Sequence, residues 1–184
     1  FKAMSAAYEI FVVDNGSNDQ SKRIVDEITE EWCANIQLID LATNTGTTYS
    51  RNCALRQCEG EYILVIDSDA YINADAVMHL QTYLEQHSQC GLAVPKLIYP
   101  DGRYQISTDV FPTFIHKLKR FFFLKKMESN SLPIGDGVRV VDYAISAFWM
   151  FPKSTLEHVG YLDEKIFYSP EDVDYCIRIW KHNL

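Results

Sequence analysis

The sequence predicts one α/β domain, built on a mostly parallel sheet with helices packed against it. Apolar runs of strand length at 8–13, 36–41 and 62–66 alternate with segments of helical periodicity. The composition of the 184 residues, 47% hydrophobic and 23% charged, is ordinary for a globular domain. Alternating strands and helices are typical of parallel sheets joined by right-handed crossovers. We therefore expect one domain over 1–184.

Caps and apolar spacing predict the helices of the first half. Residues 17–20 fit a capping box, so a helix is expected to follow them. Its predicted apolar face consists of Ile24, Ile28 and Trp32. The next helix is expected over 47–58 and is closed by Gly60. Asn73 is expected to cap a third helix over 74–86.

The regular alternation ends in the second half. A short strand is expected at 91–94, and a hairpin is expected around the turn at 100–102. Residues 128–137 form a polar, turn-rich linker. The apolar segment 138–151 predicts one long strand or a pair of strands.

Two prolines mark the last predicted helices. Pro152 begins a short helix that ends near Gly160, and Pro170 opens the final helix. The predicted apolar face of that final helix consists of Val173, Cys176, Ile177 and Trp180. Because the chain stops soon after this helix, we expect it to be a fragment of a longer protein.

Charge and cysteine content exclude several classes of protein. The net charge is −8 and the isoelectric point is about 5.0, which argues against a nucleic-acid-binding surface. The five cysteines show no C-x-x-C spacing, so neither a zinc site nor a disulfide framework is indicated. With no signal peptide and no spanning segment, a reducing, cytoplasmic setting is expected.

Acidic residues follow two of the predicted strands. Asp67 and Asp69 end the strand at 62–66 and point the same way, with Ser68 turned aside. Ligands bind beyond the carboxyl ends of strands in open α/β sheets, and paired carboxylates suit Mg²⁺ or Mn²⁺. Asp14, at the end of the first strand, can accept hydrogen bonds from a base or ribose. The alternatives are an Asp67 cap on the next helix, and an Asx turn and cap made by Asp14 and Asp19.

A third acidic group, residues 171–174, opens the final helix. Helix dipoles favour acids at this position, so simple capping is one interpretation. The other is that an aspartate there serves as a general base. No glycine-rich phosphate loop of the dinucleotide or P-loop kind is present, so a metal on Asp69 would have to bind a phosphate.

Four segments resemble glycosyltransferase family 2 in order and spacing. They are VVDNGSNDQS at 12–21, NTGTTYSRN at 44–52, GEYILVIDSDAYI at 60–72, and the run from 147 to 181 that contains EDVD. The nearest likeness is to rhamnosyltransferase-like members that build bacterial surface polysaccharides. The resemblance covers most of 10–181. It implies a GT-A fold, with a nucleotide-sugar-binding half over 1–95 and an acceptor-side half over 96–184.

The resemblance also implies roles for single residues. Asp14 would hold the nucleotide base, and Asp67 would lie near the ribose. Asp69, with Asp67, would bind Mg²⁺ or Mn²⁺. Asp172 would be the catalytic base, and Glu171 would help to place the acceptor. The remaining expected donor-site residues are Asn15, Ser17, Asp19, Asn44, Gly46, Asn52 and Ser68.

Two departures from the family pattern bear on these roles. The family's first strand would precede Phe1, and its usual Ser/Gly-Gly-Ala reads Ile145-Ser146-Ala147 here. The implied activity is inverting, metal-dependent transfer of a sugar from a nucleotide-diphosphate donor to a saccharide or lipid-linked acceptor. A magnesium-dependent nucleotidyltransferase and a non-catalytic sugar-nucleotide-binding module are the alternatives.

Residues 113–127 are basic and aromatic in an otherwise acidic chain. A cationic helix with an aromatic face can lie on an anionic membrane, which would place the protein peripherally at the inner face of the cell membrane. Alternatively, the phenylalanines pack on the acceptor side and the lysines are solvated.

Overall fold

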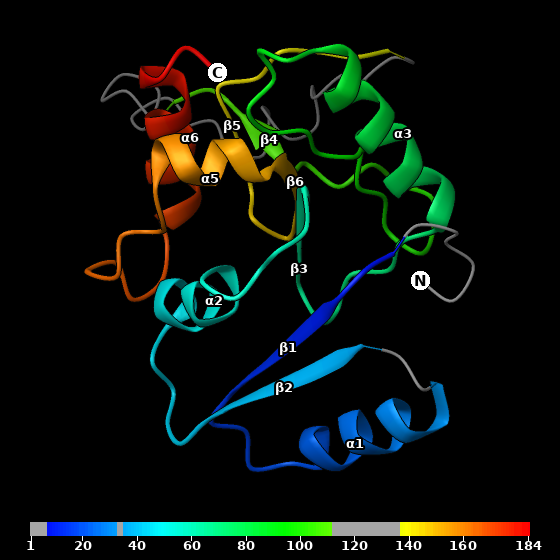
Figure 1. Ribbon diagram of the computed structural model, residues 1–184. Helices are drawn as coiled ribbons and strands as arrows, with labels where there is room; N and C mark the ends of the chain where they lie inside the picture. Colours follow the sequence, from blue (N-terminus) through cyan, green and yellow to red (C-terminus); the bar gives the residue numbers. More distant parts are fainter. Residues whose placement is uncertain (1–6, 33–34, 112–136) are drawn as a thin grey trace.

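The computed structural model describes residues 7–32, 35–111 and 137–184 (Figure 1). In chain order the elements are β1 (Ile10–Asn15), α1 (Ser21–Trp32), β2 (Ile36–Leu41), α2 (Thr47–Leu55), β3 (Tyr62–Ile66), α3 (Ala74–Gln86), β4 (Thr108–Asp109), β5 (Tyr143–Ala144), β6 (Phe148–Pro152), α5 (Lys153–Val159) and α6 (Glu171–Lys181). The α/β class is confirmed. The segment 113–127 and all but the last residue of the linker 128–137 lie outside the described residues.

The first β-α-β unit forms as predicted. β1 and β2 are parallel, in register from Ile10 opposite Ile36 to Asn15 opposite Leu41. Figure 1 shows the two strands side by side with α1 along them. The predicted apolar face of α1 needs a correction, because Ile24 is 47% exposed whereas Val25 and Ile28 are half-buried. The buried stripe is therefore rotated toward Val25.

β3 does not continue this parallel pairing. It forms an antiparallel ladder with β6, from Tyr62 opposite Pro152 to Ile66 opposite Phe148. The parallel pairing predicted for this strand is therefore wrong, because an apolar run indicates burial but not the direction of the neighbouring strand. The segment 138–151 forms a pair of strands, β5 and β6, one of the two outcomes expected. The strand expected at 91–94 is reduced to one bridge, between Ala93 and Met150.

β6 lies at the centre of the core, and its side chains alternate between two layers. Trp149 and Phe151 pack with α6, where Tyr175 stacks on Trp149 with ring centroids 5.5 Å apart. Phe148 and Met150 face α3, together with Val77 and Leu84. All four of these β6 side chains are buried, so this strand joins the helices on its two sides.

The buried face of α6 differs from the prediction. Tyr175, Cys176 and Ile179 are buried, whereas Trp180 is 43% exposed. Tyr175 is not part of the predicted apolar face, yet its ring packs against Trp149 and Phe151. The face is therefore rotated by about one residue.

Several local signals are confirmed by hydrogen bonds. The Asn73 side chain accepts a hydrogen bond from the Ala76 N–H at 2.8 Å and caps α3. The hairpin around 100–102 forms, with Tyr99 N–H donating to Arg103 O. α2, by contrast, ends at Leu55, short of the expected 58 and without a glycine cap. Among the described residues, no helix has the length and apolar character to cross a membrane.

Candidate active site

A pocket of about 410 Å³ opens where the end of β3, α2 and the first turn of α6 meet. We call it the polar pocket. Its lining residues are Thr47, Arg51, Asp67, Ile145, Ser146, Ala147, Tyr168, Ser169, Glu171 and Asp172. Segments far apart in the sequence therefore bring three predicted site residues together, namely Asp67, Glu171 and Asp172.

Asp67 is fixed at the end of β3 by its backbone and its side chain. Its N–H donates to Ala147 O at 3.0 Å, which extends the β3–β6 pairing by one residue. Its Oδ1 accepts a hydrogen bond from Arg51 Nη2 at 2.7 Å. The side chain remains 42% exposed, so this carboxylate is anchored and still accessible from the pocket.

Arg51 connects the acids on opposite sides of the polar pocket. Its Nη1 donates to Ser146 Oγ at 2.6 Å and lies 3.4 Å from Glu171 Oε1. Ser146 Oγ in turn donates to the same Glu171 oxygen at 3.0 Å. The Arg51 side chain is only 16% exposed, so these contacts are weakly screened by solvent.

Sequence reasoning missed Arg51 and Ser146 as site residues. Both lie beside residues of the family motifs, since Arg51 precedes Asn52 and Ser146 is the middle residue of Ile145-Ser146-Ala147. The available signal was the position of Arg51 directly before Asn52, a predicted donor-site residue. The partner of Arg51 could not be predicted, because 95 residues separate it from Ser146.

Asp172 has the electrostatic environment of a base. Burial raises the pKa of its carboxyl group, and the neighbouring Glu171 adds to the rise. A hydrogen bond from the Val173 N–H to Asp172 Oδ1 at 2.7 Å opposes the rise, but burial is the largest effect. A raised pKa makes the carboxylate a better proton acceptor.

The acidic loop after β1 forms the predicted Asx turn. Asp14 is 6% exposed, and its Oδ1 accepts from the Gly16 and Ser17 N–H groups at 3.0 and 2.8 Å. The backbone hydrogen bond from Ser17 is the main cause that lowers the pKa of Asp14. Asp19 is exposed and accepts from the Ser21 N–H at 2.9 Å, as expected for a cap on α1. Contacts of Asp14 with a donor stay a prediction.

Asn15 ties this loop to the one before α2. Its Oδ1 accepts from the Thr45 N–H and hydroxyl, and its Nδ2 donates to Asn44 Oδ1. Gly46 has a φ of 84°, and a Cβ there would collide with the Phe167 backbone oxygen. Because Thr47 lines the polar pocket, these contacts place the loop at the edge of that pocket.

Asn52 supports the site from beneath and does not face it. It is completely buried, and its Nδ2 donates to Leu162 O and Glu164 Oε1, both at 2.9 Å. Its Oδ1 accepts from the Leu162 N–H at 3.1 Å. Its role is therefore to hold the loop at 162–164 against α2.

Asp69 and Ser68 are exposed and lie outside the lining of the polar pocket. In the described part of the chain, no group of three or more His, Cys, Asp or Glu side chains could hold a metal ion. Mg²⁺ commonly takes one or two carboxylates and completes its shell with water and substrate phosphates. Asp67 and Asp69 supply the two carboxylates that such a shell needs, and one oxygen of Asp67 already accepts a hydrogen bond from Arg51.

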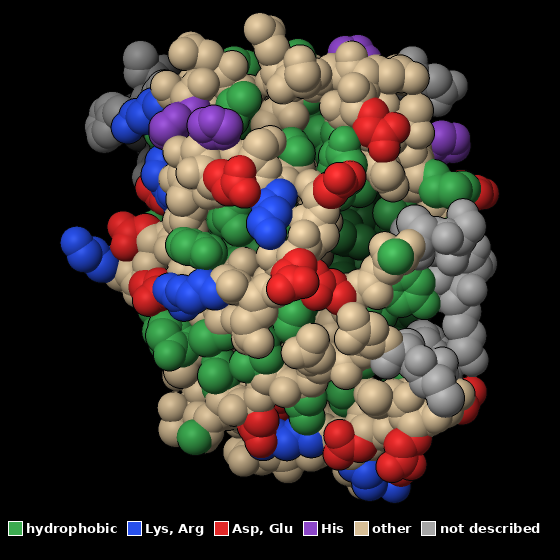
Figure 2. Space-filling view, in the orientation of Figure 1, with side chains coloured by type: hydrophobic (Ala, Val, Ile, Leu, Met, Phe, Trp, Pro, Cys, Tyr) green, Lys and Arg blue, Asp and Glu red, His purple; other side chains and the backbone are tan. Residues whose placement is uncertain are grey.

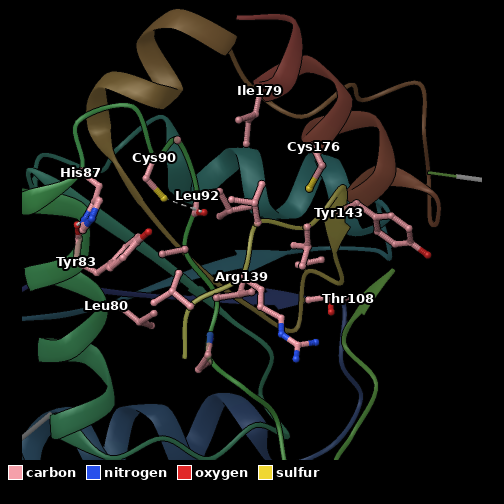
Figure 3. Close-up of a pocket in the computed structure, with 18 of the residues that line it drawn as sticks. Leu80, Tyr83, His87, Cys90, Leu92, Thr108, Arg139, Tyr143, Cys176 and Ile179 are labelled. Atoms are coloured by element: carbon pink, nitrogen blue, oxygen red, sulfur yellow. Dashed lines mark hydrogen bonds between the residues drawn. The ribbon is translucent and has the colours of Figure 1, made fainter. Parts of the chain in front are cut away.

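A second, larger cavity of about 990 Å³ lies along the later turns of α6. We call it the apolar cavity. Figure 3 shows Leu80 and Tyr83 of α3 on one side and Cys176 and Ile179 of α6 on another, with Leu92 between them.

Figure 2 shows acidic and basic side chains interspersed over the described part of one face of the molecule.

Comparison with known proteins gives a consistent family. The profile of the family described as glycosyl transferase family 2 matches residues 2–159. The chain is 26% identical to a low-salt glycan biosynthesis hexosyltransferase of Haloferax volcanii, over 100% of this chain and 57% of that protein. It is 37% identical over 81 residues to the poly(ribitol-phosphate) beta-N-acetylglucosaminyltransferase TarS of Staphylococcus aureus, covering 44% of this chain and 14% of that protein.

Solved structures match the fold. Residues 1–349 of S. aureus TarS in complex with UDP give a TM-score of 0.63 at 23% identity, over 94% of this chain and 45% of that one. A mannosyltransferase from Pyrobaculum calidifontis in complex with GDP-Man and Mn²⁺ gives 0.62 at 18% identity, over 93% and 42%. The chain spans 57% of the length of the H. volcanii relative. None of these four matches is named a rhamnosyltransferase.

Proposed function

The chain belongs to glycosyl transferase family 2, and on this basis we propose that it carries the catalytic site of an inverting transferase. The enzyme would move a sugar from a nucleotide-diphosphate donor to a saccharide or lipid-linked acceptor in polysaccharide biosynthesis. One observation supports the proposal: Asp67, at the end of β3, and Asp172, on the first turn of α6, line the same polar pocket. Inverting transfer needs a donor site and a base on opposite sides of the reacting carbon.

Asp172 acts as the general base in this proposal. The acceptor hydroxyl must lose its proton as it attacks the sugar, and a carboxylate with a raised pKa accepts that proton more readily. Glu171 is less suited to this task. It is buried, and its Oε1 already accepts hydrogen bonds from Ser146 and Arg51. We therefore propose that Glu171 helps to place the acceptor.

The donor lies on the β1 and β3 side of the pocket in this proposal. Asp67 and Asp69 would hold Mg²⁺ or Mn²⁺, which neutralises the charge that develops on the departing diphosphate. Asp14 would accept hydrogen bonds from the nucleotide base through its second oxygen, since Oδ1 is used by the Asx turn. Asn15, Asn44 and Gly46 keep the loop before α2 in place beside this donor side.

The names of relatives support a hexosyl donor, and the sequence motifs leave a rhamnosyl donor as a narrower proposal. We further propose a polymeric or lipid-linked acceptor and a cytoplasmic site of action. Peripheral contact with the inner face of the membrane through 113–127 remains part of the proposal, on the charge of that segment alone.

A panel of UDP-, GDP- and dTDP-sugars tests the proposal, with Mn²⁺ or with EDTA. Release of a nucleoside diphosphate that depends on Mn²⁺ is the expected result. Release of pyrophosphate from a nucleoside triphosphate and a sugar phosphate would identify a nucleotidyltransferase instead. Tight binding of a sugar nucleotide without any release, in the presence of a saccharide acceptor panel, would identify a non-catalytic binding module.

A further inference from the structure

We propose that Arg51 is a positioning residue that couples the donor side of the polar pocket to its acceptor side. This inference rests on the proposed function, because the roles of Asp67 and Asp172 define the two sides. Arg51 lies in the middle of α2, and it is the one cationic side chain among the described residues that line the pocket. It contacts the carboxylates of Asp67 and Glu171, and Asp172 lines the same pocket.

A single planar group makes both sets of contacts. Nη2 of Arg51 bonds Asp67 Oδ1 at 2.7 Å, while Nη1 bonds Ser146 Oγ at 2.6 Å and approaches Glu171 Oε1 at 3.4 Å. The guanidinium is rigid, so a shift of one nitrogen moves the other. A lysine ammonium would be a point charge and could not hold the two sides in a fixed geometry.

Arg51 contacts Asp67 directly and reaches Glu171 mainly through Ser146. Its bonds to Asp67 Oδ1 and Ser146 Oγ are short, whereas its direct contact with Glu171 Oε1 is at the limit of hydrogen-bonding distance. Within the described residues, no hydrogen bond or ion pair joins Asp67 to Glu171 directly, so the link between them runs through Arg51 and Ser146. If the negative charge of Glu171 is removed, Arg51 settles more fully on Asp67, and that carboxylate is less available to a donor and its cation.

The link between the acids is tested first without any ligand. Unfolding equilibria are measured for Asp67→Asn, Glu171→Gln and their double variant, in the parent and in an Arg51→Met background. Because residues in one network act non-additively, the effect of Glu171→Gln on the unfolding constant should change at least about threefold when Asp67→Asn is present. In the Arg51→Met background the two effects should be additive within about twofold. Additivity already in the parent would overturn the proposal.

Binding then tests the donor side. UDP and GDP, each with Mn²⁺, are titrated into the parent and into Glu171→Gln, and the same pair is compared in the Arg51→Met background. We expect Glu171→Gln to weaken binding of the preferred nucleotide about three- to tenfold in the parent and less than twofold without Arg51. An equal effect in both backgrounds would mean that Glu171 acts through space, and would overturn the coupling.

Two further variants keep these results interpretable. Arg51→Lys retains the charge and serves if Arg51→Met does not fold; it should lose most of the coupling, because it lacks the planar fork. Arg56→Met is the matched control, since Arg56 follows α2 and pairs with Glu164 outside the pocket. It should leave the effect of Glu171→Gln unchanged. If neither nucleotide binds the parent, the proposed function fails, and the unfolding measurements still decide whether Arg51 links the two acids.

Discussion

The polar pocket and the apolar cavity are both lined by α6, but the first is lined by acidic residues of this helix and the second by mainly apolar ones. The first turn of α6 presents Glu171 and Asp172 to the polar pocket. One and two turns later, Cys176 and Ile179 line the apolar cavity. Burial raises the pKa of both Asp172 and Cys176, and that of the thiol reaches about 11. The thiol therefore stays neutral and packs as an apolar group, whereas the carboxyl group of Asp172 lines the polar pocket.

The two regions also differ in how much they contribute to the free energy of unfolding. The layers around β6 bury large aromatic side chains, and such burial contributes about 1.5–3 kcal/mol for each side chain. The polar pocket holds partly buried acids around one arginine, an arrangement that seldom adds net stability. Burial in the core therefore stabilises the elements that carry the pocket, and the ion pairs within the pocket add little. Clusters of acids with shifted pKa values are typical of functional sites.

The largest expected effect is on turnover in the polar pocket. Asp172→Asn keeps the shape of the side chain and removes its basicity, so we expect turnover to fall by about 10²- to 10⁴-fold. The dissociation constant of the donor should change little, because the base acts in the transition state. Turnover is measured as nucleoside diphosphate release and binding by calorimetry. A large rise in the dissociation constant with turnover intact would assign Asp172 to structure alone.

The next effect concerns the core that supports both cavities. Phe151→Ala removes a fully buried ring that packs against Tyr175, so we expect the free energy of unfolding to fall by about 3–5 kcal/mol. At a temperature where the variant stays folded, its donor affinity should remain close to that of the parent. Chemical denaturation and nucleotide titration measure the two quantities. Weakened donor binding in the folded variant would show that the core and the pocket are not separable.

Metal dependence gives the third effect. Asp69→Ala should lower Mn²⁺-dependent turnover and weaken donor binding, each about 10- to 100-fold, the range seen when support for a bound metal is lost. Asp75→Ala, in the first turn of α3, is the matched control and should leave both quantities unchanged. Near-normal turnover of Asp69→Ala in the presence of EDTA would contradict the assignment of the metal to this side of the pocket.

The fourth prediction concerns how stability and turnover depend on pH through Asp172. The pKa of Asp172 is raised in the folded state, so folding favours its protonated form. Its contribution to stability is complete below the unfolded pKa of about 3.9 and is lost as the pH rises through the folded pKa. Asp172→Asn should therefore be at least as stable as the parent at pH 7. The acid limb of the parent's turnover profile should lie above the ordinary aspartate range, and a limb below pH 4 would contradict the base assignment.

The sequence predicted the features of the fold that depend on interactions between residues close together in the chain. The strand at 36–41 and the Asn73 cap depend on residues within one element, and both form as expected. The direction of β3 and the contacts of Arg51 depend on chain segments about 90 residues away, of which a local pattern carries no record. Capping alone would explain Asp67 and Asp172, so they became site candidates through the order and spacing of the motifs that contain them. That Arg51 joins Asp67 to Glu171 could only be seen in three dimensions.

The smallest expected effect tests whether the two cavities are separate at all. Arg139 lines the apolar cavity as Arg51 lines the polar pocket, and Figure 3 shows its side chain there. Arg139 is exposed, so Arg139→Ala should change the free energy of unfolding by less than about 0.5 kcal/mol. Donor affinity and turnover should match those of the parent, because the apolar cavity and the polar pocket have no lining residue in common among the described residues. A rise in the acceptor KM at constant donor affinity would show that the two cavities are not separate, because the acceptor site would then extend along α6 into the apolar cavity.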